Sequence, residues 1–396
     1  MGLPDGLSMS AKRLQNCLNI SDLRQAARKR AHKMVFDYID GGAEDEVTLA
    51  RNASAFADYE LLYRVLAGVE QVDMSTRLLG HTLDVPFFLS PSAGNRLFHK
   101  NGERAVAPAA QTYGTAYCLS TLSSVSIEEI GGLVHTPKFF QLYVWNDRTL
   151  VKEMLTRAKA AGFTALILTV DLPVHGNRER DPRNGFTIPP EMGVRQIWEA
   201  VKRPHWTWDY LTSPSISYAN VSAAQPAETL ESYVSAKLHA GFDWAEAEWL
   251  LGEWNGPAML KGVVRADDAQ QAVKSGFNAV QISNHGGRQL DGTPAPISVL
   301  ETIRQAVGSD AELVLDGGIR RGTDILKALA LGADAVSFAR PYLYGLAAGG
   351  AVGVHRALEI LTAELRRDMV LLGVGSVAEI SRDFVKHSNF AFPSKI

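Results

Sequence analysis

The chain has 396 residues, of which 46% are hydrophobic and 21% charged, and its formal net charge is −3. This length suits one large domain or two smaller ones, the charge provides no basic surface for nucleic acid, and no run approaches the roughly 18 apolar residues of a membrane span. Cys17 and Cys118 are the only cysteines and have no partner at metal-ligand spacing, so we expect neither a disulfide framework nor a metal site. With no signal-peptide pattern at the N-terminus, the sequence predicts a cytoplasmic protein.

Residues 1–84 are predicted to form helices and connecting segments that cap the rest of the chain. Beyond them, short apolar runs typical of buried parallel strands alternate with amphipathic stretches. Eight runs predict strands: Pro86–Ser90, Ala116–Ser120, Phe139–Val144, Ala165–Asp171, Ala258–Lys261, Ala279–Ser283, Leu313–Asp316 and Ala335–Ala339. The stretches between them predict helices, among them Arg148–Ala161, Asp267–Ser275, Ser298–Val307 and Asp324–Leu331.

The alternation predicts an α/β fold. Three of the helices run directly into Gly162, Gly276 or Gly332, as expected where a left-handed glycine ends a helix. Eight strand–helix units over roughly 280 residues favour a (β/α)8 TIM barrel. A doubly wound open sheet is the alternative, but no G-x-G-x-x-G follows a first strand. We therefore expect an N-terminal helical cap (1–84), a barrel (85–381) and a C-terminal tail (382–396).

A long insertion, residues 172–257, follows the fourth predicted strand. An insertion of this length without clear strands is usually functional or mobile. Within 187–224, aromatic residues alternate with cations: Arg195, Trp198, Lys202, Arg203, His205, Trp206, Trp208 and Tyr210. This composition suits a membrane interface. A lid or a subunit contact with buried aromatic residues is the other interpretation, and we favour it slightly because membrane-active segments usually show a cleaner amphipathic pattern.

Polar residues gather at the ends of the predicted strands. They are Ser90, Ser120, Gln141, Thr169, Asp171, Lys261, Ser283, His285, Asp316 and Arg340. One polar residue at a strand end is more often a cap than a catalyst. A TIM barrel, however, brings the C-terminal ends of all its strands to one face, where its active sites lie. The sequence therefore predicts one polar site at that face.

The segment 283–292, with the sequence SNHGGRQLDG, is the most informative part of the chain. His285 can move a proton near neutral pH, and Arg288 can hold a carboxylate through two parallel hydrogen bonds. Gly286 and Gly287 allow the backbone to approach a ligand closely. A base and a carboxylate clamp within one turn suit proton removal from a small acid. The alternative is a glycine-rich turn with a solvated arginine.

The loops after the last two predicted strands, 316–322 (DGGIRRG) and 339–341 (ARP), suggest a phosphate site. Barrels often bind phosphate there through backbone N–H groups and a helix N-terminus. Arg320 and Arg340 supply positive charge. Because the dipole at a helix start disfavours cations, Arg320 and Arg321 are unexpected as mere surface residues. A phosphorylated substrate or cofactor is therefore predicted.

From about Asp22 to about Ser381 the chain resembles the FMN-dependent L-2-hydroxy acid oxidase and dehydrogenase family, whose members act on glycolate, lactate or mandelate. Seven motifs in order carry the resemblance: YIDGGAEDE (38–46), QLYV (141–144), TVD (169–171), RERD (178–181), LKG (260–262), the segment 283–292 and the segment 316–322. Residues 119–121 and 178–189 are most similar to the mandelate and lactate dehydrogenase branches. The resemblance implies an FMN-dependent enzyme that oxidises a lactate- or mandelate-like acid to the 2-oxo acid.

The resemblance implies that His285 is the catalytic base. It would take either the hydroxyl proton during hydride transfer or the α proton to give a carbanion, and both orders of events stay open. Asp171 would orient His285 and stabilise its charged form. Tyr143 would donate a hydrogen bond to the substrate oxygen, where charge develops.

The resemblance also assigns the substrate pocket. Arg288 and Arg178, helped by Tyr38, would hold the substrate carboxylate. Leu122 and His175 fall at positions that vary among relatives, and together they imply an apolar pocket that is not wide open. Lactate, a longer aliphatic acid and an aryl acid all remain candidates for the substrate.

An FMN site is implied as well. Its residues are Pro91, Ser92, Ala93, Ser120, Gln141, Thr169, Lys261, Ser283, Asp316, Gly317, Gly318, Arg320, Ala339 and Arg340. Lys261 would stabilise negative charge at the pyrimidine end of the ring. The backbone of 91–93 would lie against the reactive face, and the polar side chains that end the second to fourth strands would bind the ring edges. Asp316 would bind the ribityl chain, and Arg320 and Arg340 the phosphate.

Two alanines bear on how the implied function is carried out. Ala339 stands where many relatives have glycine. If this residue lends its backbone N–H to the phosphate, alanine can replace glycine, provided that its backbone angle permits a Cβ. Ala93 is common in relatives that use oxygen, whereas several quinone-linked relatives carry glycine there. The broader resemblance around 178–189 outweighs this steric cue, so we expect electrons to pass to a quinone or similar carrier. An oxidase that produces hydrogen peroxide is the alternative.

Two other functions are weighed against this one. An FMN-dependent isomerase on the same fold would not need a carboxylate clamp beside His285, and a non-catalytic flavin protein would not need the whole set of catalytic residues. The expected partners are a 2-hydroxy acid and an electron acceptor, without nucleic acid, in a homotetramer by family analogy. Peripheral contact of 187–224 with the inner face of the membrane stays open.

Overall fold

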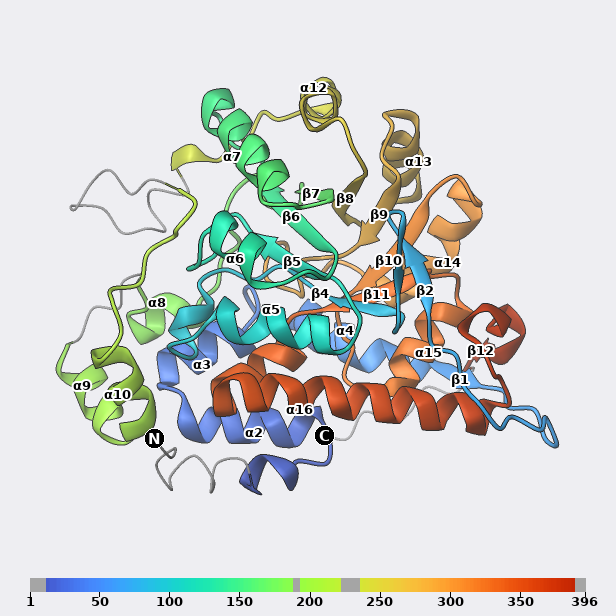
Figure 1. Cartoon of the computed structure of the whole chain (residues 1–396), viewed down its shortest axis with the longest axis horizontal. Helices are drawn as coiled ribbons and strands as arrows, with labels where there is room; N and C mark the ends of the chain where they lie inside the picture. The colour runs from blue at the N-terminus through green and yellow to red at the C-terminus, as the bar shows by residue number, and fades with distance from the viewer. Residues whose placement is uncertain (1–11, 188–192, 222–235, 389–396) are drawn as a thin grey trace.

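The computed structural model of the chain describes residues 12–187, 193–221 and 236–388. Eight parallel strands close into a barrel, in which neighbours follow the order β10, β11, β4, β5, β6, β7, β8 and β9, and β9 pairs again with β10 (Figure 1). The strands are β4 (Phe87–Leu89), β5 (Tyr117–Ser120), β6 (Lys138–Tyr143), β7 (Ala165–Thr169), β8 (Ala258–Val263), β9 (Ala279–Ile282), β10 (Glu312–Asp316) and β11 (Ala335–Phe338). Each coincides with a predicted strand, so the TIM barrel is confirmed and the open sheet is excluded.

A helix follows each barrel strand, at once or after a longer connection, and the helices cover the outside of the barrel. They are α5 (Glu103–Thr112), α6 (Ile127–Leu133), α7 (Arg148–Ala160), α12 (Trp244–Trp254), α13 (Ala266–Lys274), α14 (Pro296–Val307), α15 (Gly322–Ala330) and α16 (Arg340–Leu372). The glycines after α7, α13 and α15 have φ angles of +76°, +98° and +104°, as predicted for helix ends. α16 has non-helical backbone angles at Gly349 and Gly350.

The N-terminal part contains both helices and strands. Its helices are α2 (Ile20–Arg30), α3 (Lys33–Asp40), α4 (Val47–Ser54) and the 3-10 helix η1 (Ala55–Asp58), and α2 lies along α16 (Figure 1). It also holds β1 (Tyr59–Leu61), β2 (Thr76–Leu78) and β3 (His81–Leu83). The prediction of a helical cap over 1–84 is therefore wrong for its second half. Strands of three residues are too short to show an alternating pattern.

The β2–β3 hairpin closes the end of the barrel opposite to the C-terminal ends of the strands. Leu78, Leu79 and Leu83 are buried against Phe139 and Met259 inside the barrel. Leu79 and Gly80 at the turn have φ angles of +49° and +83°. Such two-residue turns usually begin with Asn, Asp or Gly, so a leucine gives no turn signal in the sequence.

The C-terminal residues belong to the folded unit. After the 3-10 helices η3 (Val377–Glu379) and η4 (Arg382–Phe384), β12 (Val385–His387) pairs antiparallel with β1. Phe384 is buried, and the Arg64 guanidinium lies 4.5 Å from its ring centroid. The predicted tail over 382–396 is therefore wrong for residues 382–388, and 389–396 lie outside the described residues.

The segment after β7 forms α8 (Arg180–Asn184), α9 (Val194–Val201) and α10 (Pro204–Leu211) before it returns to the barrel. α12 packs against α7 as the helix of the fourth barrel unit, so the predicted insertion over 172–257 is too long. Asp243 accepts a hydrogen bond from the N–H of Glu246, and this Asp-x-x-Glu pattern marks the start of α12. In the described part of the chain, no helix is both long and apolar enough to cross a membrane.

Candidate active site

A cavity with an empty volume of about 1180 Å3 lies at the C-terminal ends of the barrel strands. Most of the predicted site lines it: Tyr38, Pro91, Ser92, Ala93, Tyr143, Thr169, Arg178, Lys261, His285, Arg288, Asp316, Gly317, Gly318, Arg320, Ala339 and Arg340. The remaining predicted residues bond to the lining or to each other directly behind it: Asp171, Ser120, Gln141 and Ser283. This volume includes space that is open to solvent, and the cavity lies at the face where TIM barrels carry their active sites.

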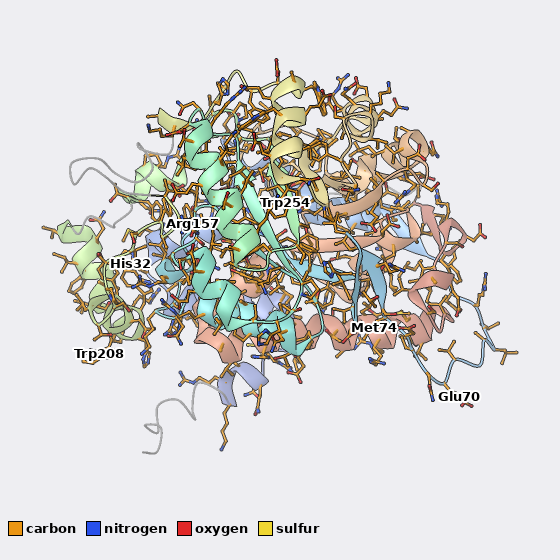
Figure 2. All side chains as sticks on the ribbon, turned by 45° about the horizontal axis from the view of Figure 1, so that its top comes forward. His32, Glu70, Met74, Arg157, Trp208 and Trp254 are labelled. Carbon is orange, nitrogen blue, oxygen red and sulfur yellow. The ribbon has the colours of Figure 1, made fainter. Side chains whose placement is uncertain are left out.

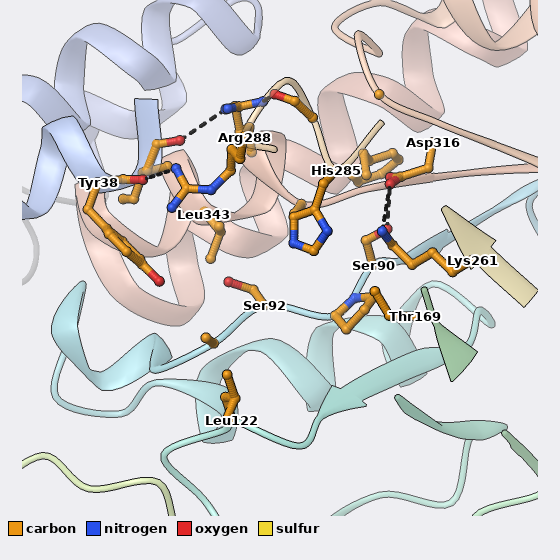
Figure 3. Close-up of a pocket in the computed structure, with 18 of the residues that line it drawn as sticks. Tyr38, Ser90, Ser92, Leu122, Thr169, Lys261, His285, Arg288, Asp316 and Leu343 are labelled. Carbon is orange, nitrogen blue, oxygen red and sulfur yellow. Dashed lines mark hydrogen bonds and ion pairs between the residues drawn. The ribbon is translucent and has the colours of Figure 1, made fainter. Parts of the chain in front are cut away.

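His285 follows β9 and points into the cavity between Lys261 on one side and Arg288 on the other (Figure 3). Its Nδ1 lies 2.8 Å from Oδ1 of Asp171, which follows β7. Because Asp171 occupies Nδ1, Nε2 is the nitrogen that remains for proton transfer. His285 has a φ of +57°, and a left-handed conformation costs a non-glycine residue of order 1–3 kcal/mol. Backbone strain of this kind is concentrated at functional sites.

The surrounding charges set the protonation of this pair. Burial would raise the pKa of Asp171, but Lys261, whose Nζ lies 3.9 Å from Oδ2, and His285 outweigh burial and lower it. Burial lowers the pKa of His285, and the nearby Lys261 adds to this, against the opposing effect of Asp171. The pair is therefore a carboxylate beside a neutral imidazole at neutral pH. In that state His285 can accept a proton.

Tyr143 ends β6 beside His285, and the two ring centroids are 6.5 Å apart. Burial, together with the nearby Tyr38 and Asp171, raises the pKa of Tyr143 far above its ordinary value. The hydroxyl therefore stays protonated. It is placed to donate a hydrogen bond to an oxygen on which negative charge develops.

Arg288 and Arg178 bring two positive charges to one side of the cavity. Burial and the neighbouring Arg178 lower the pKa of Arg288 to about 10, so it stays charged at neutral pH. Its Nη1 donates to the carbonyls of Tyr38 at 2.5 Å and Gly41 at 3.2 Å. Among the described residues, no carboxylate forms an ion pair with either arginine. Asp181 opposes their charge without pairing directly with either arginine, so both guanidinium groups keep donors for an anionic ligand.

Aromatic packing holds Arg288 in place. Its Cζ lies 4.7 Å from the ring centroid of Tyr38, which comes from α3. The ring of Phe186 also stacks against Tyr38, at a centroid distance of 4.5 Å and an interplanar angle of 17°. A guanidinium on an aromatic face gains roughly 0.5–2 kcal/mol. This stack fixes the arginine without using all of its hydrogen-bond donors.

A second polar cluster surrounds Lys261 of β8. Its Nζ donates to Ser283 Oγ at 3.2 Å and lies 3.7 Å from Asp316 Oδ2. Asp316 accepts hydrogen bonds from Ser90, Ser283 and Ser337, which come from three different barrel strands or their ends. Lys261 is only 4% exposed. The cluster thus holds a buried cation at a fixed place in the cavity wall.

A relay of hydrogen bonds crosses the ends of β5, β6 and β7. Ser120 Oγ donates to Gln141 Oε1 at 2.9 Å, and Gln141 Nε2 donates to Thr169 Oγ1 at 3.0 Å. Thr169 is the member that lines the cavity. Because its oxygen accepts from Gln141, its hydroxyl hydrogen remains for a ligand.

The predicted phosphate loops meet at the other end of the cavity. Gly317 and Gly318 have φ angles of +115° and +85°, and a Cβ on Gly318 would lie 1.9 Å from the carbonyl oxygen of Asn52. Arg320 lines the cavity, as do the first residues of α16. Ala339 has a φ of −109°, which any residue adopts, so alanine is tolerated where relatives carry glycine.

The Arg340 side chain has partners that the sequence did not suggest. Its guanidinium donates to three backbone carbonyls, those of Ile39 at 3.0 Å, Gly286 at 2.9 Å and Gly41 at 2.9 Å. These bonds tie the end of α3 to the loop that carries His285. The group of Arg340 best placed for an anion is therefore its backbone N–H in the first turn of α16.

Gly286 and Gly287 were expected to let a ligand approach the backbone. Gly286 lines the cavity, as expected for backbone that a ligand can approach, whereas Gly287 does not, and other parts of the chain lie close to both. A Cβ on Gly286 would lie 2.8 Å from Nη1 of Arg340, and one on Gly287 would lie 2.6 Å from the backbone nitrogen of Leu49 in α4. Both glycines have positive φ angles. They allow the His285 loop to pack tightly against its supports.

Several lining residues carry no motif and were not predicted: Phe98, Leu172, Tyr218 and Leu343. They come from loops and from α16, where an apolar residue gives no sequence signal for a pocket. Leu122 and His175 do line the cavity, as expected for variable pocket positions. Burial and the charge of Arg178 lower the pKa of His175 to about 4, so it is neutral at neutral pH.

Comparison with known proteins shows the family to which the chain belongs. A sequence model described as FMN-dependent dehydrogenase matches residues 27–387. An L-lactate oxidase from Nostoc is 41% identical over 372 residues, which cover 93% of this chain and 98% of the relative. An L-lactate dehydrogenase from Vibrio cholerae is 40% identical over 369 residues, which cover 92% of this chain and 97% of the relative.

Solved structures show the same similarity. A monotopic membrane protein, (S)-mandelate dehydrogenase, superimposes with a TM-score of 0.91 at 35% sequence identity, covering 94% of this chain and all of the other. A mandelate oxidase superimposes with a TM-score of 0.80 at 35% identity, covering 94% of this chain and 99% of the other.

Replacing the base tests the arrangement around His285. We expect His285→Gln to fold and keep its cofactor but to lose at least about a thousandfold in turnover, because the glutamine amide cannot take a proton. The measurement is steady-state turnover together with the rate of anaerobic reduction by substrate. Near wild-type reduction would show that another residue is the base.

The lowered pKa of His285 predicts the pH dependence. Only neutral His285 accepts a proton, so kcat/KM should fall as the pH drops through the His285 pKa of the free enzyme, below the ordinary value of roughly 6.5. In Asp171→Asn the carboxylate that raises this pKa is gone, and the acid limb should move to still lower pH while the maximum rate falls. A wild-type limb above pH 6.5, or an upward shift in Asp171→Asn, would contradict this electrostatic account.

Proposed function

Because the chain belongs to the FMN-dependent dehydrogenase family, we propose that this cavity oxidises an L-2-hydroxy acid to the corresponding 2-oxo acid. The observation that carries the proposal is the position of two cations without carboxylate partners, Arg178 and Arg288, beside the neutral base His285. The anion they indicate is the carboxylate of the substrate. An isomerase would have no use for this pair of cations next to the base.

The cavity fits FMN. Bound FMN would take two electrons from the substrate and later transfer them to an acceptor. Lys261 is a buried cation that would face the pyrimidine end of the ring, and the Thr169 hydroxyl would bind its edge. Arg320 and the first turn of α16 would hold the phosphate, since Arg320 forms no ion pair with a described residue. Residues 91–93 line the cavity between these ends.

The chain's own residues would divide the work at the substrate. Arg288 and Arg178 bind the carboxylate and thereby fix the hydroxyl-bearing carbon relative to His285. Nε2 of His285 takes a proton, and Asp171 stabilises the resulting imidazolium. The protonated hydroxyl of Tyr143 donates to the substrate oxygen as its charge changes.

The substrate side chain would lie among apolar residues. Phe98, Leu122, Leu172 and Tyr218 line the cavity and suit a small aliphatic or an aryl group. Relatives are named for lactate and for mandelate, which are such acids. We therefore place the substrate in the lactate- and mandelate-like class.

The electron acceptor is the finer part of the proposal. Among similar proteins are both oxidases and dehydrogenases. Ala93 lines the cavity and narrows the space at the expected reactive face by one methyl group, as in relatives that use oxygen. The resemblance of residues 178–189 to dehydrogenases supports a quinone or similar carrier, and we retain that acceptor, with oxygen as the alternative.

One experiment tests substrate and acceptor together. The purified yellow protein is mixed without oxygen with L-lactate or L-mandelate, and we expect the flavin absorbance to bleach. Arg288→Lys serves as the control, because lysine keeps the charge but not the two-pronged geometry, and bleaching should slow at least about tenfold. No bleaching with any 2-hydroxy acid would refute the function.

The reduced enzyme is then mixed with air-saturated buffer or, without oxygen, with a soluble quinone. We expect fast reoxidation by the quinone and slow reoxidation by air. Fast reaction with air that forms one hydrogen peroxide per flavin would make the protein an oxidase.

We further propose that α9 and α10 contact a membrane surface. Six apolar side chains of these helices are more than half exposed, beside the exposed Lys202 and His205: Val194, Ile197, Trp198, Val201, Trp208 and Leu211. On the inner side, Trp206 is buried and its Nε1 donates to the carbonyl of Leu97 at 2.9 Å, while Asp209 pairs with Arg30 of α2 at 2.6 Å. Trp208 lies at the outer edge of the molecule, far from Glu70 (Figure 2). One structural relative is described as a monotopic membrane protein.

Cosedimentation with anionic liposomes tests this contact. We expect the wild type to sediment and a variant with serine at four exposed positions, Ile197, Trp198, Trp208 and Leu211, to remain in solution with unchanged solution activity. A matched control replaces exposed apolar residues at the opposite end of the molecule: Val65, Leu66, Val370 and Leu371. If the wild type and the four-serine variant are recovered equally in solution, α9 and α10 do not contact the membrane. If the oligomer becomes smaller in the four-serine variant alone, these helices form a subunit interface.

A further inference from the structure

We infer that Gln289 is a positioning residue for the substrate clamp: its buried side-chain amide holds the segment 171–178, and Arg178 with it, against the loop of His285 and Arg288. This inference rests on the proposed function. Gln289 directly follows Arg288, is 8% exposed and does not line the cavity. It would act through Arg178 and would not touch the substrate.

The amide of Gln289 makes four hydrogen bonds, all to the segment after β7. Its Nε2 donates to the carbonyls of Asp171 at 3.1 Å and Val174 at 3.0 Å. Its Oε1 accepts from Nη2 of Arg178 at 3.0 Å and from the backbone N–H of Gly176 at 3.4 Å. Both ends of the amide are therefore used, and a substitute with only donors or only acceptors cannot replace it.

Apart from the Gln289 loop, this segment is held by a hydrogen bond from the N–H of Glu44 to the carbonyl of Asn177 at 2.8 Å. No helix or strand lies between Thr169, which ends β7, and Arg180, which begins α8. Gly176 packs so closely on the Gln289 loop that a Cβ there would lie 2.4 Å from the carbonyl oxygen of Arg288 and 2.7 Å from Cα of Gln289. The close contact brings the two segments together, and the amide of Gln289 sets their register.

Arg178 depends on this contact for its direction. Its Nε donates to the carbonyl of Arg288 at 3.2 Å, and its Nη2 donates to Gln289. No carboxylate of the described residues forms an ion pair with Arg178. Two donors on one edge of the guanidinium are thus held by the 288–289 loop, which leaves the remaining donors for a carboxylate in the cavity.

Gln289→Met removes these bonds at nearly constant volume. We expect the KM for the 2-hydroxy acid to rise about tenfold and kcat to fall by less than about threefold, because Arg178 loses its alignment while His285 and Asp171 keep their own hydrogen bond. A second readout does not need turnover: oxalate, a small carboxylate that cannot be oxidised in this way, should bind about tenfold more weakly when titrated by the change in flavin absorbance.

A double-mutant cycle separates positioning from general loosening. In an Arg178→Met background, Gln289→Met should change KM and oxalate affinity by less than about twofold, since its target is gone. If the effects of the two substitutions on KM and on oxalate affinity multiply in the double variant, Gln289 does not act through Arg178 and the inference is wrong. Gln111→Met is the matched control, because Gln111 accepts one hydrogen bond, from the N–H of His135, far from the cavity, and it should leave both readouts unchanged.

If Gln289→Met does not fold or does not bind flavin, a smaller substitution tests the same role. Gln289→Asn keeps the amide but shortens the side chain by one carbon, so it cannot reach all four partners. We expect at least a threefold rise in KM and in the oxalate dissociation constant. Values within twofold of wild type would overturn the role of Gln289. That result is distinct from failure of the proposed function, in which the wild type itself is not reduced by any 2-hydroxy acid.

Discussion

The buried contact between Asp171 and His285 is the interaction on which the rest of the site depends. It joins the end of β7 to the loop after β9, and Lys261 of β8 lies between them. A carboxylate enclosed in protein needs such compensation, because burial by itself would raise its pKa. With Lys261 and His285 present, Asp171 stays charged and His285 stays neutral. The barrel thus holds a base in its active form by electrostatics that three adjacent strands provide.

The loop after β9 is braced on several sides by segments distant in the chain. Asp291 accepts from the N–H groups of Val47 and Thr48 at the start of α4, and Arg340 of α16 binds the carbonyl of Gly286. Gln289 holds the segment after β7. These bonds offset the strained backbone of His285 and leave the faces of His285 and Arg288 toward the cavity for the substrate. The loop is therefore rigid where proton transfer needs a fixed geometry.

Much of the fold could be predicted because buried parallel strands have a plain signature. Runs such as Ala165–Thr169 are apolar on both faces, and glycines mark the ends of the helices that follow. The elements that were missed have weaker local signals. The β2–β3 hairpin and the β1–β12 pair consist of three-residue strands, and β12 pairs with a partner more than 300 residues away. Pairings of this kind are stabilised by tertiary packing, which no local pattern reports.

The sequence by itself determined the chemistry that this protein carries: a histidine, an aspartate, a lysine and two arginines at the ends of barrel strands or in the loops beyond them, which must meet at one face. Only the tertiary structure decided what each side chain touches. It turned the Arg340 guanidinium to backbone carbonyls, placed Leu49 where a ligand was expected at Gly287, and gave Gln289 its four partners. The reason is physical. Hydrogen bonds form between atoms about 3 Å apart, and which segments approach so closely depends on how the whole chain packs.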